Sequence, residues 1–275
     1  MSIPVFRATK RKLYDLTRPI LGPHLEKLKN FRSRMSETGN SVDPWNYKGH
    51  PDQPFGHITY AQFGEDILLL NLFTKLGIER PSFLDIGAHH PLNCSNTALL
   101  YSRGSRGVCV EANPNLVGAF SEKRPEDLIL NIGCGPQKGI LDFFMIDHSS
   151  GRNTFDRATA EAFIKANPNF SIREIRKIPI LTLDEIVSGH CCGRWPEFLS
   201  LDVEGLDLAV LKASKLTSSN GPRIICVEAV AGNDNDLSKA IEHLLHNRGF
   251  TIAARTVANL IFCRTEDLIL WNSEN

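Results

Sequence analysis

Short apolar runs alternate with stretches of helical periodicity along most of this chain. Apolar residues recur at helical spacing from Phe63 to just before Gly77, and again over residues 237–245. Between such stretches lie uninterrupted apolar runs, which are typical of strands buried on both faces. The predicted strands cover residues 82–86, 107–110, 128–132, 140–146, 198–201, 224–227, 250–253 and 260–263. Strands that alternate with helices predict an α/β fold with a mostly parallel sheet and helices on both faces.

Capping signals place the starts of two helices. Asn113 is a favourable N-cap residue and Pro114 is suited to the first helical position. Residues 182–185 have the spacing of a capping box and predict the start of a short helix. A further helix is expected over residues 95–103, between the first two strands. The Arg-rich residues 173–177 are expected to be solvated and to precede a helix.

The first 57 residues differ in composition from the rest of the chain. Residues 1–40 hold nine Lys or Arg and three Asp or Glu, a net charge of +6, whereas the whole chain of 275 residues has a net charge of zero. Residues 41–57 are rich in Pro, Gly and aromatic side chains, which is typical of an irregular linker. We expect a basic extension and linker over residues 1–57 and one domain over residues 58–275. The extension is either a solvated tail or a segment that docks on a membrane surface or a partner protein.

Composition argues against several classes of protein. No apolar run approaches the roughly 20 residues that span a bilayer, and no apolar stretch of a secretory signal stands at the N-terminus. The seven cysteines show no C-x-x-C spacing, which favours a reducing compartment over a disulfide framework or a zinc ribbon. We therefore expect a cytoplasmic protein. The net charge of −6 over residues 41–275 disfavours a groove that follows nucleic-acid phosphates.

Carboxylates follow four of the predicted strands. They are Asp85, Glu111, Asp202 and Glu228. Ligands of open α/β sheets bind beyond the carboxyl ends of the strands. Helix caps and turns explain one or two acidic residues at such positions, but they explain four poorly. The sequence therefore predicts a ligand site at this edge of the sheet.

The turn after the first strand limits the choice of ligand. Gly87 is followed by Ala88, His89 and His90, so the second and third glycines of the G-x-G-x-x-G fingerprint are missing. Close approach of a pyrophosphate would be crowded here, whereas a nucleoside cofactor without pyrophosphate, such as S-adenosylmethionine, needs no such approach. Glu111 follows Gly87 at a distance of one helix and a turn, where a carboxylate accepts hydrogen bonds from ribose hydroxyls. Spacing alone indicates nucleoside binding and leaves the cofactor open.

Five short segments, in order and at compatible spacing, resemble the FkbM family of S-adenosylmethionine-dependent methyltransferases. They are residues 61–66, 83–91, 95–97, 110–114 and 199–205, which read AQFGED, FLDIGAHHP, SNT, VEANP and LSLDVEG. The resemblance covers about residues 60–265 and leaves out the first 57. It implies a class I methyltransferase (Rossmann-like) fold, in which a mostly parallel seven-stranded sheet has an antiparallel last strand. It also implies O-methylation, with a glycan, a sugar-containing metabolite or another natural product as the acceptor.

The resemblance implies a set of cofactor-binding residues. The first turn and the helix after it would hold the methionyl part, Glu111 the ribose, and Asn131 the adenine, although Asn131 fits a plain turn residue equally well. The positions implied are Asp85, Gly87, Ala88, Asn96, Thr97, Glu111 and Asn131.

Asp202, Glu204 and His90 are the expected catalytic residues. In one reading, Asp202 faces the cofactor's amino group. In a second reading, one carboxylate of this region is the general base for a sugar hydroxyl. A third reading has Asp202 and Glu228 bind Mg²⁺ through their oxygens. A neutral imidazole is a natural base near pH 7, and of His89 and His90 we favour His90, since at least one of the pair is expected only to pack in the turn.

Three other functions compete with O-methyl transfer. The missing glycines disfavour an NAD-dependent oxidoreductase. A nucleic-acid methyltransferase commonly has an Asp/Asn-Pro-Pro-aromatic turn where this chain has residues 202–205, DVEG. A non-catalytic scaffold has no need of the strand-end carboxylates. Acceptor contacts are expected from residues 145–180 and from the stretch before residue 60.

Overall fold

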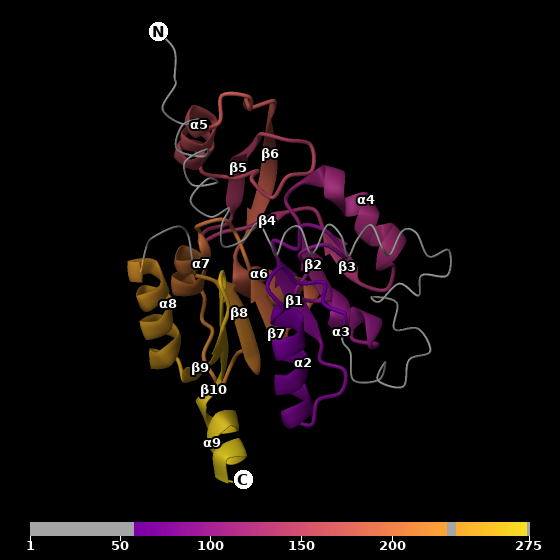
Figure 1. Cartoon of the computed structure of the whole chain (residues 1–275), viewed down its shortest axis with the longest axis vertical. Helices are drawn as coiled ribbons and strands as arrows, with labels where there is room; N and C mark the ends of the chain where they lie inside the picture. The colour runs from indigo at the N-terminus through magenta and orange to yellow at the C-terminus, as the bar shows by residue number, and fades with distance from the viewer. Residues whose placement is uncertain (1–57, 230–234, 274–275) are drawn as a thin grey trace, which may run out of the picture. The chain divides into compact units, whose positions relative to one another are not determined.

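The computed structural model describes residues 58–229 and 235–273, in which a seven-stranded sheet forms the centre (Figure 1). Its strand order is β3-β2-β1-β7-β8-β10-β9. The strands are β1 (Phe83–Ile86), β2 (Gly107–Val110), β3 (Leu128–Leu130), β7 (Phe198–Leu201), β8 (Ile224–Glu228), β9 (Phe250–Arg255) and β10 (Asn259–Arg264). The first five run parallel, and β10 is antiparallel to both of its neighbours. The predicted class I methyltransferase sheet with an antiparallel last strand is therefore confirmed.

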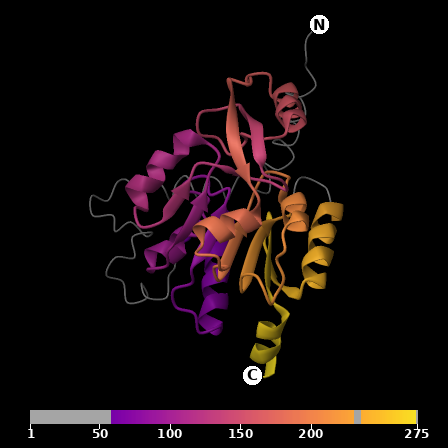
Figure 2. The same ribbon diagram turned by 180° about the vertical axis from the view of Figure 1, so that it is seen from behind.

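Helices cover both faces of this sheet. The helices of the first layer are α2 (Glu65–Lys75), α3 (Ala98–Ser102) and α4 (Pro114–Lys123), and those of the second are α6 (Leu183–His190), α7 (Asp207–Ala213) and α8 (Asn235–Asn247). Neighbouring residues of β1 show why two layers form: Phe83 packs with the first layer, whereas Leu84 packs with the second. In Figure 1 α2 lies in front of the sheet, and Figure 2 views the opposite face, on which α6 lies. Helix α9 (Thr265–Ser273) follows β10.

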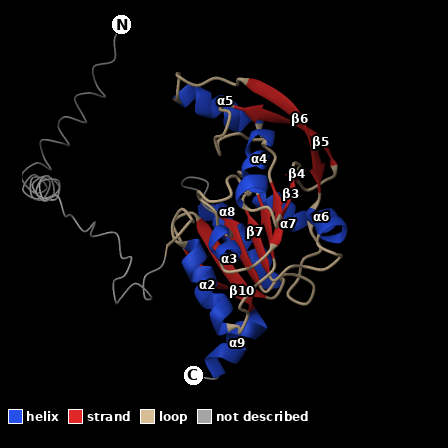
Figure 3. Cartoon of the chain, turned by 90° about the vertical axis from the view of Figure 1, so that its right-hand side faces the viewer, coloured by secondary structure: helices blue, strands red, loops and turns tan. Residues whose placement is uncertain are grey.

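A separate three-stranded sheet stands at the end of the domain away from α9 (Figure 3). It consists of β4 (Gly133–Cys134), β6 (Glu174–Leu181) and β5 (Gly139–Met145) in this order, and α5 (Arg157–Ala166) lies beside it. The strand predicted over residues 140–146 is present, but it pairs with β6 and not with the main sheet. Residues 173–177 are exposed apart from the half-buried Arg176, as expected of a solvated stretch, but most of them lie in β6. The buried residues of β6 are Ile178 and Ile180, in the second half of the strand, whereas its charged residues lie in the first half.

The acidic end of the AQFGED segment joins distant parts of the domain. The buried Glu65 carboxylate accepts hydrogen bonds from Thr256 Oγ1 (2.6 Å) and Asn259 Nδ2 (2.9 Å), in the turn between β9 and β10. The Asp66 carboxylate accepts from Thr59 Oγ1 (2.6 Å) and from the backbone N–H of Tyr60 (2.7 Å). Both carboxylates of this segment therefore stabilise the start of α2.

The extension predicted over residues 1–57 lies outside the described residues, so its boundary stays a prediction. Within residues 58–229 and 235–273, no helix has the length and apolar character needed to cross a membrane.

Candidate functional site

A cleft of about 250 Å³ opens beyond the carboxyl ends of β1, β2 and β7. Apolar side chains line it on the β3 side, and carboxylates line it at the ends of β2 and β7. The apolar residues include Val110, Ile132, Phe143 and Phe155, and the acidic residues are Glu111, Asp202 and Glu204. No Lys or Arg of the described part of the chain lines this cleft. Its walls therefore suit a ligand with an apolar ring at one end and positive charge at the other.

Gly87 brings three strand ends together at the floor of the cleft. Its N–H donates to Val110 O at 2.9 Å, which joins the ends of β1 and β2. Its φ is +77°, and a Cβ at this position would lie 1.7 Å from the backbone oxygen of Asp202. Only glycine fits, because both the left-handed backbone and the contact with β7 exclude a side chain.

Glu111 is a buried carboxylate at the end of β2. Its Oε2 accepts the His89 N–H at 2.7 Å, and its Oε1 accepts the Asn113 N–H at 2.6 Å. Burial raises the pKa of Glu111 to about 7 in spite of these two bonds. Each oxygen retains a second lone pair toward the cleft. Glu111 therefore both fixes the turn after β1 and remains able to accept hydroxyl hydrogen bonds.

Asp202 carries a buried oxygen without a partner. Among the described residues, Oδ1 of Asp202 is buried and accepts no hydrogen bond, although the residue lines the cleft. A side-chain hydrogen bond joins Asp202 to Glu228, so one of the two carboxyls holds a proton. Burial and the charge of Asp202 raise the pKa of Glu228 to about 9, which places the proton on Glu228 at neutral pH. Asp202 therefore brings to the cleft a carboxylate that shares a proton with Glu228.

The turn after β7 presents a second carboxylate. Glu204 has a left-handed backbone with φ +51°, and burial with the charges of Asp202 and Asp207 raises its pKa to about 7. Asp207 accepts the N–H groups of Val203 (3.1 Å) and Gly205 (3.2 Å) and so fixes this turn. Left-handed conformations of non-glycine residues often mark functional sites. Those that line this cleft are His89, Cys94 and Glu204.

The two histidines of the first turn have different surroundings. His89 lines the cleft, whereas His90 does not. Nδ1 of His90 accepts the N–H groups of Leu92 (3.1 Å) and Asn93 (3.0 Å), which shapes the turn. Burial lowers the pKa of both histidines, so both are neutral near pH 7. The structure thus places His89, and not the favoured His90, against the cleft.

Several of the expected cofactor-binding residues lie behind the cleft wall and not in it. Asp85 is buried and accepts a hydrogen bond from Thr97 Oγ1 at 2.5 Å. Nδ2 of Asn96 donates to Ser200 Oγ at 3.2 Å, and Ala88 is buried in the apolar layer. Asn131 is exposed and donates to the backbone oxygens of Glu111 (2.8 Å) and Ala112 (3.1 Å). These residues support the loops around the cleft, and their direct contact with a cofactor stays a prediction.

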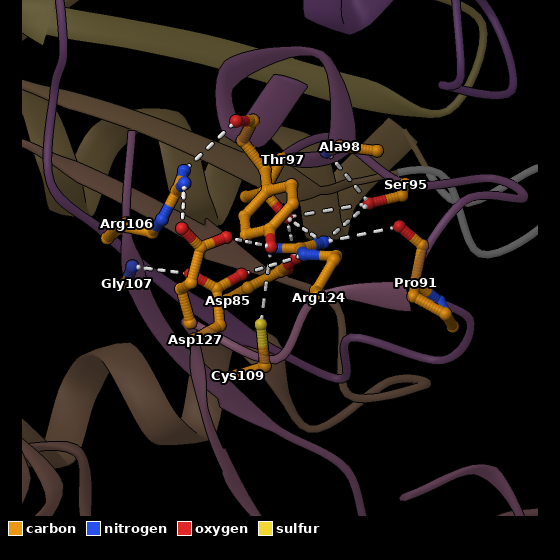
Figure 4. Close-up of polar contacts among 12 residues, drawn as sticks. Asp85, Pro91, Ser95, Thr97, Ala98, Arg106, Gly107, Cys109, Arg124 and Asp127 are labelled. Atoms are coloured by element: carbon orange, nitrogen blue, oxygen red, sulfur yellow. Dashed lines mark hydrogen bonds and ion pairs between the residues drawn. The ribbon is translucent and has the colours of Figure 1, made fainter. Parts of the chain in front are cut away.

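A fully buried arginine anchors this supporting layer, and sequence reasoning missed it (Figure 4). Arg124 pairs with Asp127 through Nε and Oδ2 at 2.7 Å, and its Nη1 donates to Thr97 Oγ1 at 3.0 Å. Longer bonds of 3.4 Å reach Pro91 O and Ser95 Oγ. Arg124 therefore connects the end of α4 with the loop between β1 and α3. An Arg and an Asp three residues apart do not by themselves indicate burial, and the other partners, Pro91, Ser95 and Thr97, come from a distant segment.

Metal ligation finds no geometric support in the described residues. Within them, no group of three or more His, Cys, Asp or Glu side chains is arranged to hold a metal ion. The two expected ligands, Asp202 and Glu228, are hydrogen-bonded to each other.

The model of the methyltransferase FkbM domain matches residues 85–252, more than half of the chain. The chain belongs to the FkbM family. This domain is thereby assigned to the S-adenosylmethionine-dependent methyltransferases, which separates it from NAD-dependent oxidoreductases. No curated protein matches the sequence.

Solved methyltransferase structures resemble the FkbM domain distantly. A TehB-like S-adenosylmethionine-dependent methyltransferase from Corynebacterium glutamicum is 9% identical, with 88% of this chain and 99% of that one covered and a TM-score of 0.38. Magnesium protoporphyrin IX methyltransferase from Synechocystis PCC 6803 with bound S-adenosylmethionine is 12% identical, with 77% and 86% covered and a TM-score of 0.35. Precorrin-6y C5,15-methyltransferase from Geobacter metallireducens is 12% identical, with 75% and 91% covered and a TM-score of 0.34. The fold assignment rests on the strand order and not on these distant similarities.

Proposed function

We propose that this chain transfers the methyl group of S-adenosylmethionine to a hydroxyl oxygen of a glycan, a sugar-containing metabolite or another natural product. The observation that carries the proposal is a cleft lined by the carboxylates of Glu111, Asp202 and Glu204 and by no Lys or Arg of the described residues. Such a cleft favours a cation, and the cofactor brings a sulfonium and an ammonium group. When bound, the cofactor supplies an electrophilic methyl group.

The cleft offers a separate place for each part of this cofactor. Asp202 Oδ1 would accept a hydrogen bond from the amino group, and Glu111 would accept the ribose hydroxyls. The apolar side, with Phe143 and Phe155, would cover the adenine. Gly87 lets the ends of β1 and β7 approach each other at the floor of the cleft, beneath the place of the cofactor.

Methyl transfer to a hydroxyl requires that a proton leave the acceptor oxygen. A general base works best when its pKa lies near the operating pH. Glu204 meets this condition, because burial and neighbouring charges raise its pKa to about 7 and it lines the cleft. We assign to Glu204 the role of the general base that takes the hydroxyl proton. His89 is neutral and lines the same cleft, and it would orient the acceptor hydroxyl.

Calorimetry with the purified full-length protein tests the cofactor. S-adenosylmethionine and S-adenosylhomocysteine are expected to bind in the micromolar range, whereas NAD is not. Binding of NAD without binding of either sulfur compound would overturn the proposal. Added EDTA tests the Mg²⁺ reading separately, and we expect no change of turnover.

Isotope transfer tests the acceptor atom. Protein incubated with methyl-labelled S-adenosylmethionine and fractionated host glycans and metabolites should label a product whose NMR spectrum shows a methoxy group. A labelled methyl group on nitrogen or carbon would contradict O-methyl transfer and leave the cofactor assignment intact.

A further inference from the structure

Residues 147–155 form a loop over the cleft, here called the roof loop, which is fastened at both ends. Near its start, His148 O accepts a hydrogen bond from Asn113 Nδ2 at 3.0 Å, which ties it to the end of β2. Near its end, Thr154 and Phe144 exchange two backbone hydrogen bonds of 2.8 and 3.2 Å, which tie it to β5. The loop therefore has a fixed position over the cleft.

A buried asparagine holds the roof loop in shape from within. Oδ1 of Asn153 accepts the N–H groups of Ile146 (2.9 Å) and Asp147 (3.2 Å), and its Nδ2 donates to Asp147 O (2.8 Å). Asn153 is 5% exposed, so water competes little for these bonds. The position of residues between Asp147 and Asn153 is thereby restricted.

Gly151, near the middle of the roof loop, faces the two groups assigned to the acceptor. A Cβ on Gly151 would lie 3.9 Å from Glu204 Oε1 and 4.0 Å from His89 Cε1. Apart from its chain neighbours, no other described residue comes within 4 Å of that point. A Cβ at position 151 would therefore be in van der Waals contact with both groups, and a larger side chain there would cover them.

The backbone does not explain a glycine here. The conformation of Gly151 lies outside the left-handed region, in contrast to that of Gly87 or Gly205. Alanine would adopt it without strain, since only a positive φ favours glycine. What the glycine provides at this position is space between the roof loop and the two catalytic turns.

We propose that the gap at Gly151 is the entrance through which the acceptor hydroxyl reaches His89 and Glu204, and that residue 151 sets the size of the group that enters. This inference rests on the proposed function. The charges that act on Glu204 are those of the carboxyl groups of Asp202 and Asp207, which raise its pKa, and that of Arg152, which lowers it. The acceptor therefore carries no anionic group next to its reacting hydroxyl, as is true of a neutral sugar or polyol, because such a group would be repelled.

Substitutions at position 151 test the entrance by its size. Gly151→Leu should raise the KM for the acceptor, or lower kcat/KM, by tenfold or more, and Gly151→Ala by no more than about threefold. The dissociation constant of S-adenosylhomocysteine should stay within twofold in both. Gly139→Leu is the matched control, because Gly139 is exposed, has no atom within 4 Å of its Cβ position and lies away from the cleft. Wild-type kcat/KM for Gly151→Leu, or an equal loss of cofactor affinity, would overturn the inference.

A second measurement does not depend on which atom is methylated. Diethyl pyrocarbonate modifies neutral imidazole, and peptide mass spectrometry resolves modification at His89. With S-adenosylhomocysteine bound, Gly151→Leu should slow this modification at least fivefold relative to Gly139→Leu. Equal rates would refute the entrance at Gly151. If the rates differ but methyl groups are found on nitrogen or carbon, the entrance stands and only the proposed O-methyl transfer fails.

Discussion

The backbone oxygen of Asp202 occupies the space in which a side chain on Gly87 would begin, at 1.7 Å from the Cβ position. This contact brings the ends of β1 and β7 together without any side chain between them. Gly87 and Asp202 both line the cleft, so the close approach that this glycine allows sets the width of the cleft floor.

Substitution of Gly87 by alanine should therefore disable the site. The new Cβ would meet a backbone oxygen and would adopt an unfavourable φ, a strain on the order of 1–3 kcal/mol even after the turn moves. We expect at least a tenfold weaker affinity for S-adenosylhomocysteine by calorimetry. Gly118→Ala in α4, where no atom lies within 4 Å, is the control and should gain about 0.5–1 kcal/mol of unfolding free energy. Equal affinities of the two variants would contradict this account.

Glu111→Ala should weaken cofactor binding about tenfold or more. Hydrogen bonds to a charged group contribute about 1.5–3 kcal/mol each, and the variant also frees the His89 and Asn113 N–H groups. Titration of the folded variant checks this, with Glu126→Ala as the control because Glu126 is exposed and pairs with Arg106 on the surface. Unchanged affinity in a folded Glu111→Ala protein would contradict the assignment of Glu111 to the ribose hydroxyls.

Asp202→Asn should reduce turnover by on the order of a hundredfold while the protein stays folded. The change keeps the size of the side chain but removes the negative charge that would hold a cationic cofactor. Loss of one such electrostatic contact typically lowers kcat by about a hundredfold or more. Glu204→Gln should lower kcat without changing cofactor affinity if Glu204 is the base, and His90→Ala should affect the turn more than the chemistry. Full turnover by Asp202→Asn would show that Oδ1 serves no ligand.

The stability of the protein should fall as pH rises toward neutrality. Burial and the charge of Asp202 raise the pKa of Asp207 to about 7, from the value of about 3.9 that is usual for Asp. The folded state therefore holds a proton that the unfolded state releases, so this stability is present at low pH and is lost as pH rises to about 7. Urea titrations at pH 5.5 and pH 8 should show a decrease of about 2 kcal/mol from this group. Asp207→Asn should show a smaller decrease, and an equal decrease would assign the effect elsewhere.

Arg124→Met should uncouple the loop between β1 and α3 from α4. Breaking a buried ion pair costs about 3–5 kcal/mol, and Thr97 and Asp127 would lose their shared partner. We expect weaker cofactor binding, measured by calorimetry well below the melting temperature, in addition to lower stability. Arg223→Met, which breaks the Arg223–Asp267 pair away from the cleft, should lower stability alone. Wild-type cofactor affinity for Arg124→Met would reduce its role to folding.

Much of the main sheet was predictable, because its strands are continuous apolar runs buried on both faces. The ends of these strands also located Gly87, Glu111, Asp202 and Glu204, all of which line the cleft. Of the small sheet only β5 was predicted, since β6 mixes charged residues with the few apolar ones that it buries.

The sequence also did not indicate which histidine side chain of the first turn lies against the cleft. His89 and His90 are adjacent, and only hydrogen bonds to Leu92 and Asn93 decide which ring leaves the cleft. The roof loop and Gly151 were expected only as part of a variable acceptor region, because their contacts join segments far apart in sequence. Distance along the chain also explains why Arg124 escaped notice.

The bond between Glu65 and Asn259 spans 194 residues and affects how the protein is made. On the ribosome, α2 emerges early, but its buried carboxylate has no amide partner until the turn after β9 has been synthesised. The central strand β1 likewise waits for β7 before its second edge is paired. A nascent chain halted in between presents open strand edges, which are the surfaces that chaperones shield and that aggregate when unshielded. Folding of the main sheet can therefore be completed only after the residues up to β10 have been synthesised.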